Sequence, residues 1–303
     1  VPREAFCIYP GGAAKGAELG GAVLETCERS VIFGGLPTIE RYRGNARVSA
    51  HGPGFSKVII GEDKIDDWEQ YLDLMTDGSY VNSGRSCISC SGIWVPRHAA
   101  EIADALAKRL GPIAPKPMTD PESGLAAFTM PGAAEAMNGQ IDDGCDSPAV
   151  TEVTAKYRDG DRLVKNLRCD FLRPTVLHVT DPDDPMANTE YMFPFCSVVE
   201  CPQDQMLEKI GYTLVGSCLT DDEKFKRELL DATNIDRLNI GEVKTIQLNW
   251  LQPHEGNIID FLVRSRASAN KKRCSSRPCA TSPHLRSPPG RWPWIRPSRW
   301  IKS

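Results

Sequence analysis

The sequence has no long hydrophobic run: no stretch approaches the roughly 18 uncharged apolar residues that a membrane-spanning helix needs. It also has no initiator methionine, and its first residues, V-P-R-E, contain neither the basic region nor the apolar region of a signal peptide. These absences predict a cytoplasmic protein without a membrane segment. The start of the chain further indicates that it continues a longer polypeptide.

The composition excludes several classes of protein. The 303 residues include 41 % hydrophobic and 25 % charged side chains, which is typical of a globular protein. The length predicts about two domains and a sizeable core. A disulfide-stapled miniprotein, a collagen-like repeat and a wholly disordered chain are therefore excluded.

Acidic side chains are missing from residues 268–303, which contain nine Lys or Arg and no Asp or Glu. The first 267 residues hold the remaining 27 basic and all 40 acidic side chains, so the body of the chain is acidic. An acidic body argues against nucleic-acid binding, which needs a basic face that neutralises phosphates. We interpret the Arg-, Pro-, Ser- and Trp-rich tail as disordered or as translation past a frameshift; a basic arm for nucleic acid or membrane is the alternative.

The eleven cysteines are an odd number scattered along the chain. In a reducing compartment such residues are more often small buried apolar groups than disulfide partners. Cys87 and Cys90 form a C-x-x-C pair, which is compatible with a redox disulfide or with half of a zinc site. No second Cys or His pair lies at ligand spacing, so we predict no metal site.

Strand and helix patterns alternate along the body of the chain. This alternation predicts a mixed α/β architecture with a parallel sheet and without internal repeats. The expected strands are 5–9, 30–33, 57–60, 93–95, 171–179, 196–200 and 242–248, and the expected helices are 13–25, 65–75, one that begins at Pro96, 203–212 and 221–232.

Two glycine turns could direct backbone N–H groups at a phosphate. One is the turn at 10–12, and the other is Gly34-Gly35, which follows the strand at 30–33. Neither matches the G-x-G-x-x-G pattern of dinucleotide-binding proteins. Each turn, taken alone, is more often an ordinary connection between a strand and a helix.

Cys87 is the strongest candidate for a catalytic residue. It ends the segment 82–87 (N-S-G-R-S-C), in which Gly84 permits a tight bend that can present the sulfur in a cleft. Two buried cysteines are the alternative interpretation of this motif. His51, in the segment 51–57 (H-G-P-G-F-S-K), is a candidate base, and a hydrogen-bonded loop histidine is its alternative.

Five segments, taken in order, resemble the aldehyde dehydrogenase superfamily. The resemblance covers nearly the whole body of the chain, from about residue 2 to 266. Each motif is weak alone, whereas the ordered set is fairly specific. The segments are 30–35 (S-V-I-F-G-G, family F-T-G-S), 51–57 (family E-L-G-G-K-S), 82–87 (family N-x-G-Q-x-C), 170–177 (D-F-L-R-P-T-V-L, a family strand ending in P-T-V) and 190–194 (E-Y-M-F-P, family E-x-F-G-P).

The resemblance implies a set of roles for these residues. Cys87 would be the nucleophile that adds to an aldehyde, with its own backbone N–H as one donor to the oxyanion. Gly35 would lie beside the phosphates of NAD or NADP, and Glu190 would hold the nicotinamide ribose. Counting back from the end of its motif places Tyr191 there instead. The resemblance also implies an aldehyde substrate and, for the full-length form, a homo-oligomer.

The chain departs from the family pattern in three ways. His51 stands where the family has its general-base Glu, and relatives that transfer the acyl group to coenzyme A also lack this Glu. Leu36 replaces a phosphate-contacting Ser. The N-terminal part of the cofactor domain, which supplies an Asn donor and a cofactor Lys, does not precede Val1.

These observations lead to a division of the chain and a set of functions. Residues 1–60 would be the remaining part of a Rossmann-like NAD(P)-binding domain, 61–248 the catalytic domain, 249–267 a C-terminal extension and 268–303 the basic tail. The expected function is oxidation of an aldehyde to an acid with NAD(P)+, with Cys87 as nucleophile and His51 as base. The alternatives are a coenzyme A-acylating enzyme, a non-catalytic truncated remnant, and a hydrolase that uses Cys87 and His51 without a nucleotide.

Overall fold

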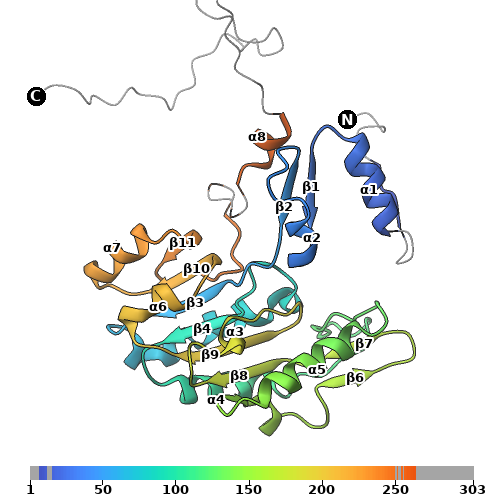
Figure 1. Ribbon diagram of the computed structural model, residues 1–303. Helices are drawn as coiled ribbons and strands as arrows, with labels where there is room; N and C mark the ends of the chain where they lie inside the picture. The colour runs from blue at the N-terminus through green and yellow to red at the C-terminus, as the bar shows by residue number, and fades with distance from the viewer. Residues whose placement is uncertain (1–6, 12–15, 250, 252–253, 255, 264–303) are drawn as a thin grey trace, which may run out of the picture. The chain divides into compact units, whose positions relative to one another are not determined.

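A seven-stranded sheet forms the centre of the computed structural model, which describes residues 7–11, 16–249, 251, 254 and 256–263 (Figure 1). The strand order is β11–β10–β3–β4–β9–β8–β5, and every neighbouring pair is parallel except β5 with β8. The predicted α/β class with a largely parallel sheet is therefore confirmed. The strands are β3 (Lys57–Ile60), β4 (Gly92–Val95), β5 (Val150–Glu152), β8 (Thr175–Val179), β9 (Phe195–Glu200), β10 (Thr213–Leu219) and β11 (Ile235–Ile240).

Helices cover both faces of this sheet, which explains why β3 and β4 are buried at every residue. Alternate residues serve opposite faces: Val58 packs with α3 (Leu72–Tyr80) and α4 (Ala99–Leu110), whereas Ile59 belongs to the core on the other face. That second face is covered by α5 (Ala133–Cys145), α6 (Gln203–Lys209) and α7 (Glu223–Asp231). The predicted stripe of α4, from Ile102 to Leu110, is fully buried in the first core.

A smaller parallel sheet comes from the first part of the chain. It consists of β1 (Ser30–Phe33) and β2 (Val48–His51), with α1 (Gly16–Thr26) before it and the short α2 (Leu36–Glu40) between the two strands. Residues 57–60, which the predicted division includes in the cofactor part, form β3 of the seven-stranded sheet. The passage from the small sheet to the large one therefore falls within residues 52–56.

The remaining elements are short. The strands β6 (Leu163–Lys165) and β7 (Asp170–Leu172) pair in an antiparallel hairpin, and α8 (Ile258–Val263) lies near the end of the described chain. The described part of the chain also contains four short 3-10 segments: Ile65–Tyr71, Val81–Gly84, Thr154–Lys156 and Pro185–Asn188. No helix among the described residues is long and apolar enough to cross a membrane.

Two predicted strands are wrong, at least in the described residues. Residues 242–248 form no strand, because Gly241 (φ +101°) turns the chain away from β11, and hydrogen bonds from Val243 N–H to Gly241 and from Gln247 N–H to Lys244 continue in turns. Residues 7–9 of the expected strand 5–9 have no regular structure, and 5–6 lie outside the described residues. The basic tail, 268–303, also lies outside them.

Other predicted elements are present with altered bounds. The helix expected at 65–75 is a 3-10 segment, interrupted by non-helical backbone at Asp67, followed by α3. The strand expected at 171–179 is divided into β7 and β8 on either side of Arg173 and Pro174. Proline has no N–H to donate to a neighbouring strand, so a break there is physically reasonable.

Candidate functional site

The site is assembled from segments that precede three adjacent parallel strands. Residues 54–56 lead into β3, 87–91 lead into β4, and 190–194 lead into β9. Since β3 pairs with β4 and β4 pairs with β9, all in parallel, the three segments meet at the amino ends of these strands. Side chains from three separate motifs are thereby brought to one place.

The segment before Cys87 bends sharply, as the sequence predicts. Asn82, Ser83 and Gly84 have consecutive positive φ angles of 57°, 55° and 61°. A Cβ on Gly84 would lie 2.5 Å from the carbonyl oxygen of Phe193, so a side chain does not fit there. This run of left-handed residues is costly and is maintained only because the surrounding structure imposes it.

Cys87 is half-buried and its backbone is held by the loop that precedes β3. The Ser56 hydroxyl donates a hydrogen bond to the Cys87 carbonyl (2.8 Å). Gly54 lies directly against the same carbonyl, because a Cβ there would be only 1.8 Å from the oxygen. The Cys87 side chain packs beside Ile88 and Leu214. The segment that carries the thiol is therefore held by the loop before β3 and by side-chain packing against β10.

The second cysteine of the C-x-x-C pair has a different environment. Cys90 is fully buried, its thiol donates to the Gly92 carbonyl (3.3 Å), and burial raises its pKa to about 11. All nine cysteines in the described part of the chain are free thiols. No group of three or more His, Cys, Asp or Glu in the described ranges could hold a metal ion. Of the pair, Cys87 is the accessible member.

Glu190 is bound to the same loop as Cys87. Its carboxylate accepts hydrogen bonds from the backbone N–H of Gly54 (3.2 Å) and of Phe55 (2.5 Å). Burial raises the pKa of Glu190 to about 7, although the two N–H donors and the charge of Lys57 act in the opposite direction. Glu190 is thus a carboxyl group that exchanges its proton near neutral pH.

Lys57 is a buried cation that binds the backbone of the loop before β3. It is only 1 % exposed, its ammonium donates to the Phe55 carbonyl (2.7 Å), and it lies 5.9 Å from the centre of the Phe55 ring. Burial lowers the pKa of Lys57 to about 8. Phe55 has a positive φ of 47°, so Lys57 on its carbonyl and Glu190 on its N–H hold a strained peptide unit from both sides.

His51 is the last residue of β2, rather than part of a loop. Its ring stacks on Phe33 at 5.3 Å between centres and with an interplanar angle of 27°. Its Nε2 is 2.8 Å from the Ser49 hydroxyl, within hydrogen-bond distance. The ring is thus oriented by the small sheet on which it lies.

One cavity of about 640 Å³ brings the predicted site residues together. Cys87, His51, Glu190 and Gly35 all line it, as does Tyr191, the alternative position for Glu190. At Gly35 a Cβ would meet only the Pro37 ring, at 3.8 Å, so its backbone is open. The other lining residues are Phe33, Gly34, Gly52, Pro53, Arg85, Ser86, Met137 and Met192.

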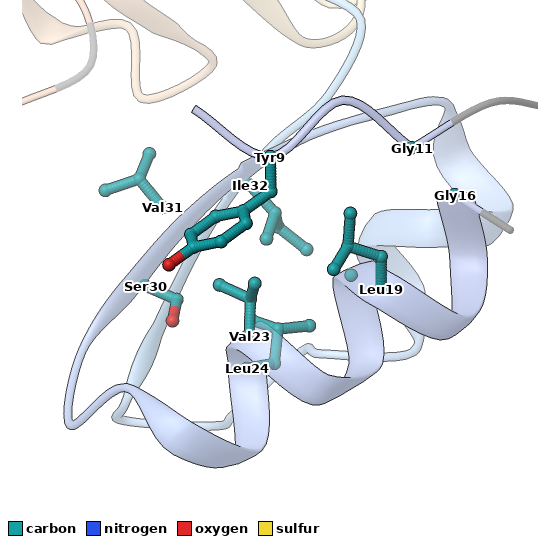
Figure 2. A pocket seen from close by; sticks show the side chains of 10 residues that line it. Tyr9, Gly11, Gly16, Leu19, Val23, Leu24, Ser30, Val31 and Ile32 are labelled. Atoms are coloured by element: carbon teal, nitrogen blue, oxygen red, sulfur yellow. The ribbon is translucent and has the colours of Figure 1, made fainter. Parts of the chain in front are cut away.

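Two other cavities lack this combination. One of about 750 Å³ shares the wall formed by 51–53 and is also lined by Tyr212, Asp236 and His254. Another, of about 430 Å³, lies between α1 and β1; Figure 2 shows apolar side chains of α1 directed toward Tyr9 and Ile32. Its described lining contains no Cys, His or charged side chain, so it carries no candidate chemistry.

Sequence reasoning missed Lys57, Gly54 and Arg85. A lysine at the start of an otherwise apolar strand, K-V-I-I, was a signal that a charge is buried. Gly54 was recognised only as part of a turn, since its contact with Cys87 depends on strand pairing. Arg85 stands in place of the Gln of the family motif, and this difference is its signal in the sequence.

The fold and cavity define an α/β protein with a parallel-rich sheet, a second small parallel sheet and a cysteine-containing cavity lined by both parts. The profile of the aldehyde dehydrogenase family matches residues 37–257. The chain therefore belongs to the aldehyde dehydrogenase family.

Solved structures of aldehyde dehydrogenases have the same fold. The NAD+ complex of an aldehyde dehydrogenase from Bacillus cereus is 19 % identical, with a TM-score of 0.62 over 74 % of this chain and 46 % of the other. A putative methylmalonate-semialdehyde dehydrogenase from Sinorhizobium meliloti, complexed with NAD, is 18 % identical, with a TM-score of 0.62 over 76 % and 48 %. Glyceraldehyde-3-phosphate dehydrogenase from Methanocaldococcus jannaschii, complexed with NADP, is 16 % identical, with a TM-score of 0.59 over 73 % and 47 %.

The chain spans slightly less than half the length of these structures. A search of curated protein sequences found no significant match.

Proposed function

We propose that this chain is the catalytic portion of an enzyme that oxidises an aldehyde to a carboxylic acid with NAD or NADP. The observation that carries the proposal is the cavity in which Cys87, His51 and Glu190 meet in a chain of the aldehyde dehydrogenase family. A half-buried thiol on a rigid, strained loop suits a nucleophile that must meet a carbonyl carbon in one orientation.

The residues present fit the nicotinamide–ribose end of such a cofactor. Gly35 offers open backbone on one wall of the cavity, and the Glu190 carboxylate lies on the cavity lining as an acceptor for ribose hydroxyls. The similar structures from Bacillus cereus and Methanocaldococcus jannaschii are complexes with NAD+ and NADP, which supports a nicotinamide cofactor for this chain. When bound, the cofactor would supply the hydride acceptor for the oxidation. In this proposal the part of the chain that carries the small sheet belongs to the cofactor domain, and the seven-stranded sheet, which begins with β3 at Lys57, belongs to the catalytic domain.

The chain's own residues supply the nucleophile and the base. The Cys87 thiolate forms a bond to the aldehyde carbon, and the negative charge moves to the carbonyl oxygen, which the Cys87 backbone N–H would stabilise. After oxidation the acyl group remains on Cys87. His51 would take a proton from water, whose oxygen attacks the acyl carbon and releases the acid and the thiolate.

Acyl transfer to coenzyme A is the second candidate outcome. The carboxylate base of the family is replaced by His51, whose ring stacks on Phe33 and whose Nε2 lies against Ser49. The contact with Ser49 occupies Nε2, one of the two ring nitrogens that could accept a proton from water. In this version the thiol of coenzyme A, rather than water, attacks the acyl–Cys87 group.

The direct test uses the 303-residue chain with NAD+ or NADP+ and a panel of aliphatic aldehydes, with reduced nicotinamide as the readout. We expect turnover in the parent and at least about a thousandfold loss in Cys87→Ser, because a hydroxyl is a much weaker nucleophile. Cys169→Ser, outside the cavity, is the matched control and should retain activity.

Three outcomes separate the alternatives. Product release that depends on coenzyme A assigns the acyl-transfer version. Equal turnover in the parent and in Cys87→Ser overturns the proposal. Failure of the parent to bind either nucleotide in a calorimetric titration, together with no turnover, identifies a non-catalytic remnant.

A further inference from the structure

Arg85 lines the same cavity as Cys87, two residues before it in the chain. It follows directly on the strained Asn82–Gly84 backbone, and its own N–H donates to the Asn82 carbonyl (3.1 Å). The bend that presents Cys87 therefore also determines where this guanidinium lies. Its side chain is half-buried rather than extended into solvent.

Among the described residues, the contacts of Arg85 include a carbonyl group and an aromatic ring but no carboxylate. One Nη2 hydrogen bond goes to the Ala126 carbonyl (3.1 Å), and the guanidinium lies 4.4 Å from the centre of the Phe128 ring. The Nε group is buried without a hydrogen-bond partner. In the described part of the chain, no carboxylate lies within ion-pair distance of it. Burial, acting alone, lowers the pKa of Arg85, which agrees with the missing counter-charge.

Arg162, a more deeply buried arginine, shows the usual arrangement. Arg162 is 6 % exposed and pairs with both Glu152 and Asp142. Arg237 resembles Arg85 in having no carboxylate partner among the described residues, but it does not line the Cys87 cavity. Arg85 thus combines two features: its guanidinium has no carboxylate partner in the described part of the chain, and the residue lines the cavity of the nucleophile.

The other charged group of the cavity does not neutralise Arg85. Both carboxylate oxygens of Glu190 accept backbone N–H groups, and the cation that acts on Glu190 is Lys57. A planar guanidinium with unused donors matches the two oxygens of a carboxylate or the oxygens of a phosphate. The missing counter-charge is therefore best supplied by a ligand.

We propose that Arg85 binds a carboxylate or phosphate group of a molecule that occupies the Cys87 cavity. This inference rests on the proposed function for the identity of that molecule: the anion is either an acid group on the aldehyde itself or a phosphate of the nucleotide. Both sources share the same recognition chemistry. In the first case, the enzyme prefers aldehydes that carry an acid group at the far end.

The test measures how anions protect Cys87 from alkylation by iodoacetamide, with the labelled peptide quantified by mass spectrometry. Succinate represents an acid-bearing substrate, ADP-ribose represents the phosphates of the cofactor, and succinamide is the neutral control. We expect at least one of the two anions to slow labelling of Cys87 in the parent, whereas succinamide does not. This readout needs no turnover.

Substitutions then assign the effect to Arg85. In Arg85→Gln we expect about tenfold to hundredfold more of the protecting anion to be needed, the range for a charge-assisted hydrogen bond. Arg85→Lys keeps the charge and loses the planar guanidinium, so the anion concentration it needs for protection should lie between those of the parent and of Arg85→Gln. Arg109 is an exposed arginine paired with Asp73, and Arg109→Gln should need the same anion concentration for protection as the parent.

The protecting anion that depends on Arg85 identifies the source of the ligand group. If succinate protects the parent but not Arg85→Gln, the anion that Arg85 binds is an acid group of the substrate. If ADP-ribose protects the parent but not Arg85→Gln, the anion is a phosphate of the cofactor. Equal protection in the parent and in Arg85→Gln, or no protection by either anion, overturns the inference. Arg85-dependent protection in a chain that oxidises no aldehyde would keep the anion site and reject the dehydrogenase proposal instead.

Discussion

Cys87 and Cys90 illustrate how two thiols three residues apart acquire opposite properties. Cys87 is half-buried beside the cavity, whereas Cys90 is enclosed by the core between β4 and α3. The C-x-x-C spacing alone is compatible with a redox pair, but burial of one thiol separates their chemistry. The thiolate is the reactive form, so burial suppresses reactivity twice, through access and through the pKa.

We expect iodoacetamide at pH 8 to alkylate Cys87 much faster than Cys90. With a pKa of about 11, Cys90 has on the order of one thiolate in a thousand molecules at that pH, and it is fully buried. Peptide mapping by mass spectrometry measures both rates in one sample, and the exposed Cys27 serves as an internal standard for a reactive thiol. Labelling of Cys90 at the rate of Cys27 would contradict the described packing.

Glu190 is expected to make stability depend on pH. Its folded-state pKa of about 7 lies above its ordinary value of 4.5, because burial disfavours the ionised form. Between these values the folded protein retains a proton that the unfolded chain has lost. The free energy of unfolding should therefore fall as the pH rises through this window, by about 3 kcal/mol from this group.

Urea unfolding of the parent and of Glu190→Gln at pH 5 and pH 8 isolates this effect. The variant should be less stable at both values, since an amide NH2 would face one of the two backbone N–H groups, but it should lose less stability between them. Glu69→Gln, at an exposed position, should behave as the parent. An identical pH dependence in the parent and in Glu190→Gln would show that Glu190 is already ionised at pH 5.

At the scale of elements, the loop before β3 and the loop before β4 form one structure. Gly54 lies against the Cys87 carbonyl, and Ser56 bonds to the same oxygen. The strands place these loops together, and the loops in turn place the thiol. Glycine is required at Gly54 by the close approach of another backbone, not by its φ angle.

We expect Gly54→Ala to lower the free energy of unfolding by about 3 kcal/mol and to alter the reactivity of Cys87. A Cβ would overlap the Cys87 carbonyl, whose movement breaks the Ser56 hydrogen bond. Gly139→Ala is the matched control: it lies within α5 with open space around it, and it should raise stability by about 0.5–1 kcal/mol. Equal stability of the two variants, from denaturant titrations, would contradict this account.

The elements that the sequence predicts best are those with a strong local pattern. The buried strand 57–60 and the helical stripe from Ile102 to Leu110 were predicted because burial leaves a regular apolar pattern. β10 and β11 were both missed, and 242–248 was predicted as the last strand; in β11, an edge strand, polar residues interrupt the apolar pattern of I-D-R-L-N-I. Such a strand depends on its neighbour, β10, more than on its own composition.

The residues of the candidate site also divide into those that local patterns predict and those that they do not. Cys87, His51 and Glu190 were predicted from motifs, and the structure places all three on one cavity. Lys57 and Gly54 were not, since their roles depend on contacts between segments that are far apart in the sequence. A sequence pattern therefore identifies reactive residues more easily than it identifies the residues that hold them in place.

At the scale of the whole molecule, the two sheets differ in how well they are buried. Every residue of β3 and β4 is buried between helices, whereas β1 and β2 are half-buried and Phe33 is 66 % exposed. A two-stranded sheet contributes little stability by itself. The proposed catalytic cavity nevertheless depends on both sheets, because His51 ends β2, Gly35 lies in the turn after β1, and Cys87 precedes β4 of the large sheet.

Hydrogen–deuterium exchange should therefore divide the chain into two classes. We expect the amides of β3, β4 and β9 to exchange slowest and those of β1 and β2 markedly faster, because local opening requires less buried area to be exposed in the small sheet. Addition of NAD+ or NADP+ should slow exchange selectively around Gly35 and in residues 51–55, where the proposed cofactor site adjoins the small sheet. Binding of either nucleotide with slowed exchange confined to the large sheet would reject this placement, and equal exchange in both sheets without nucleotide would reject the difference in their stability.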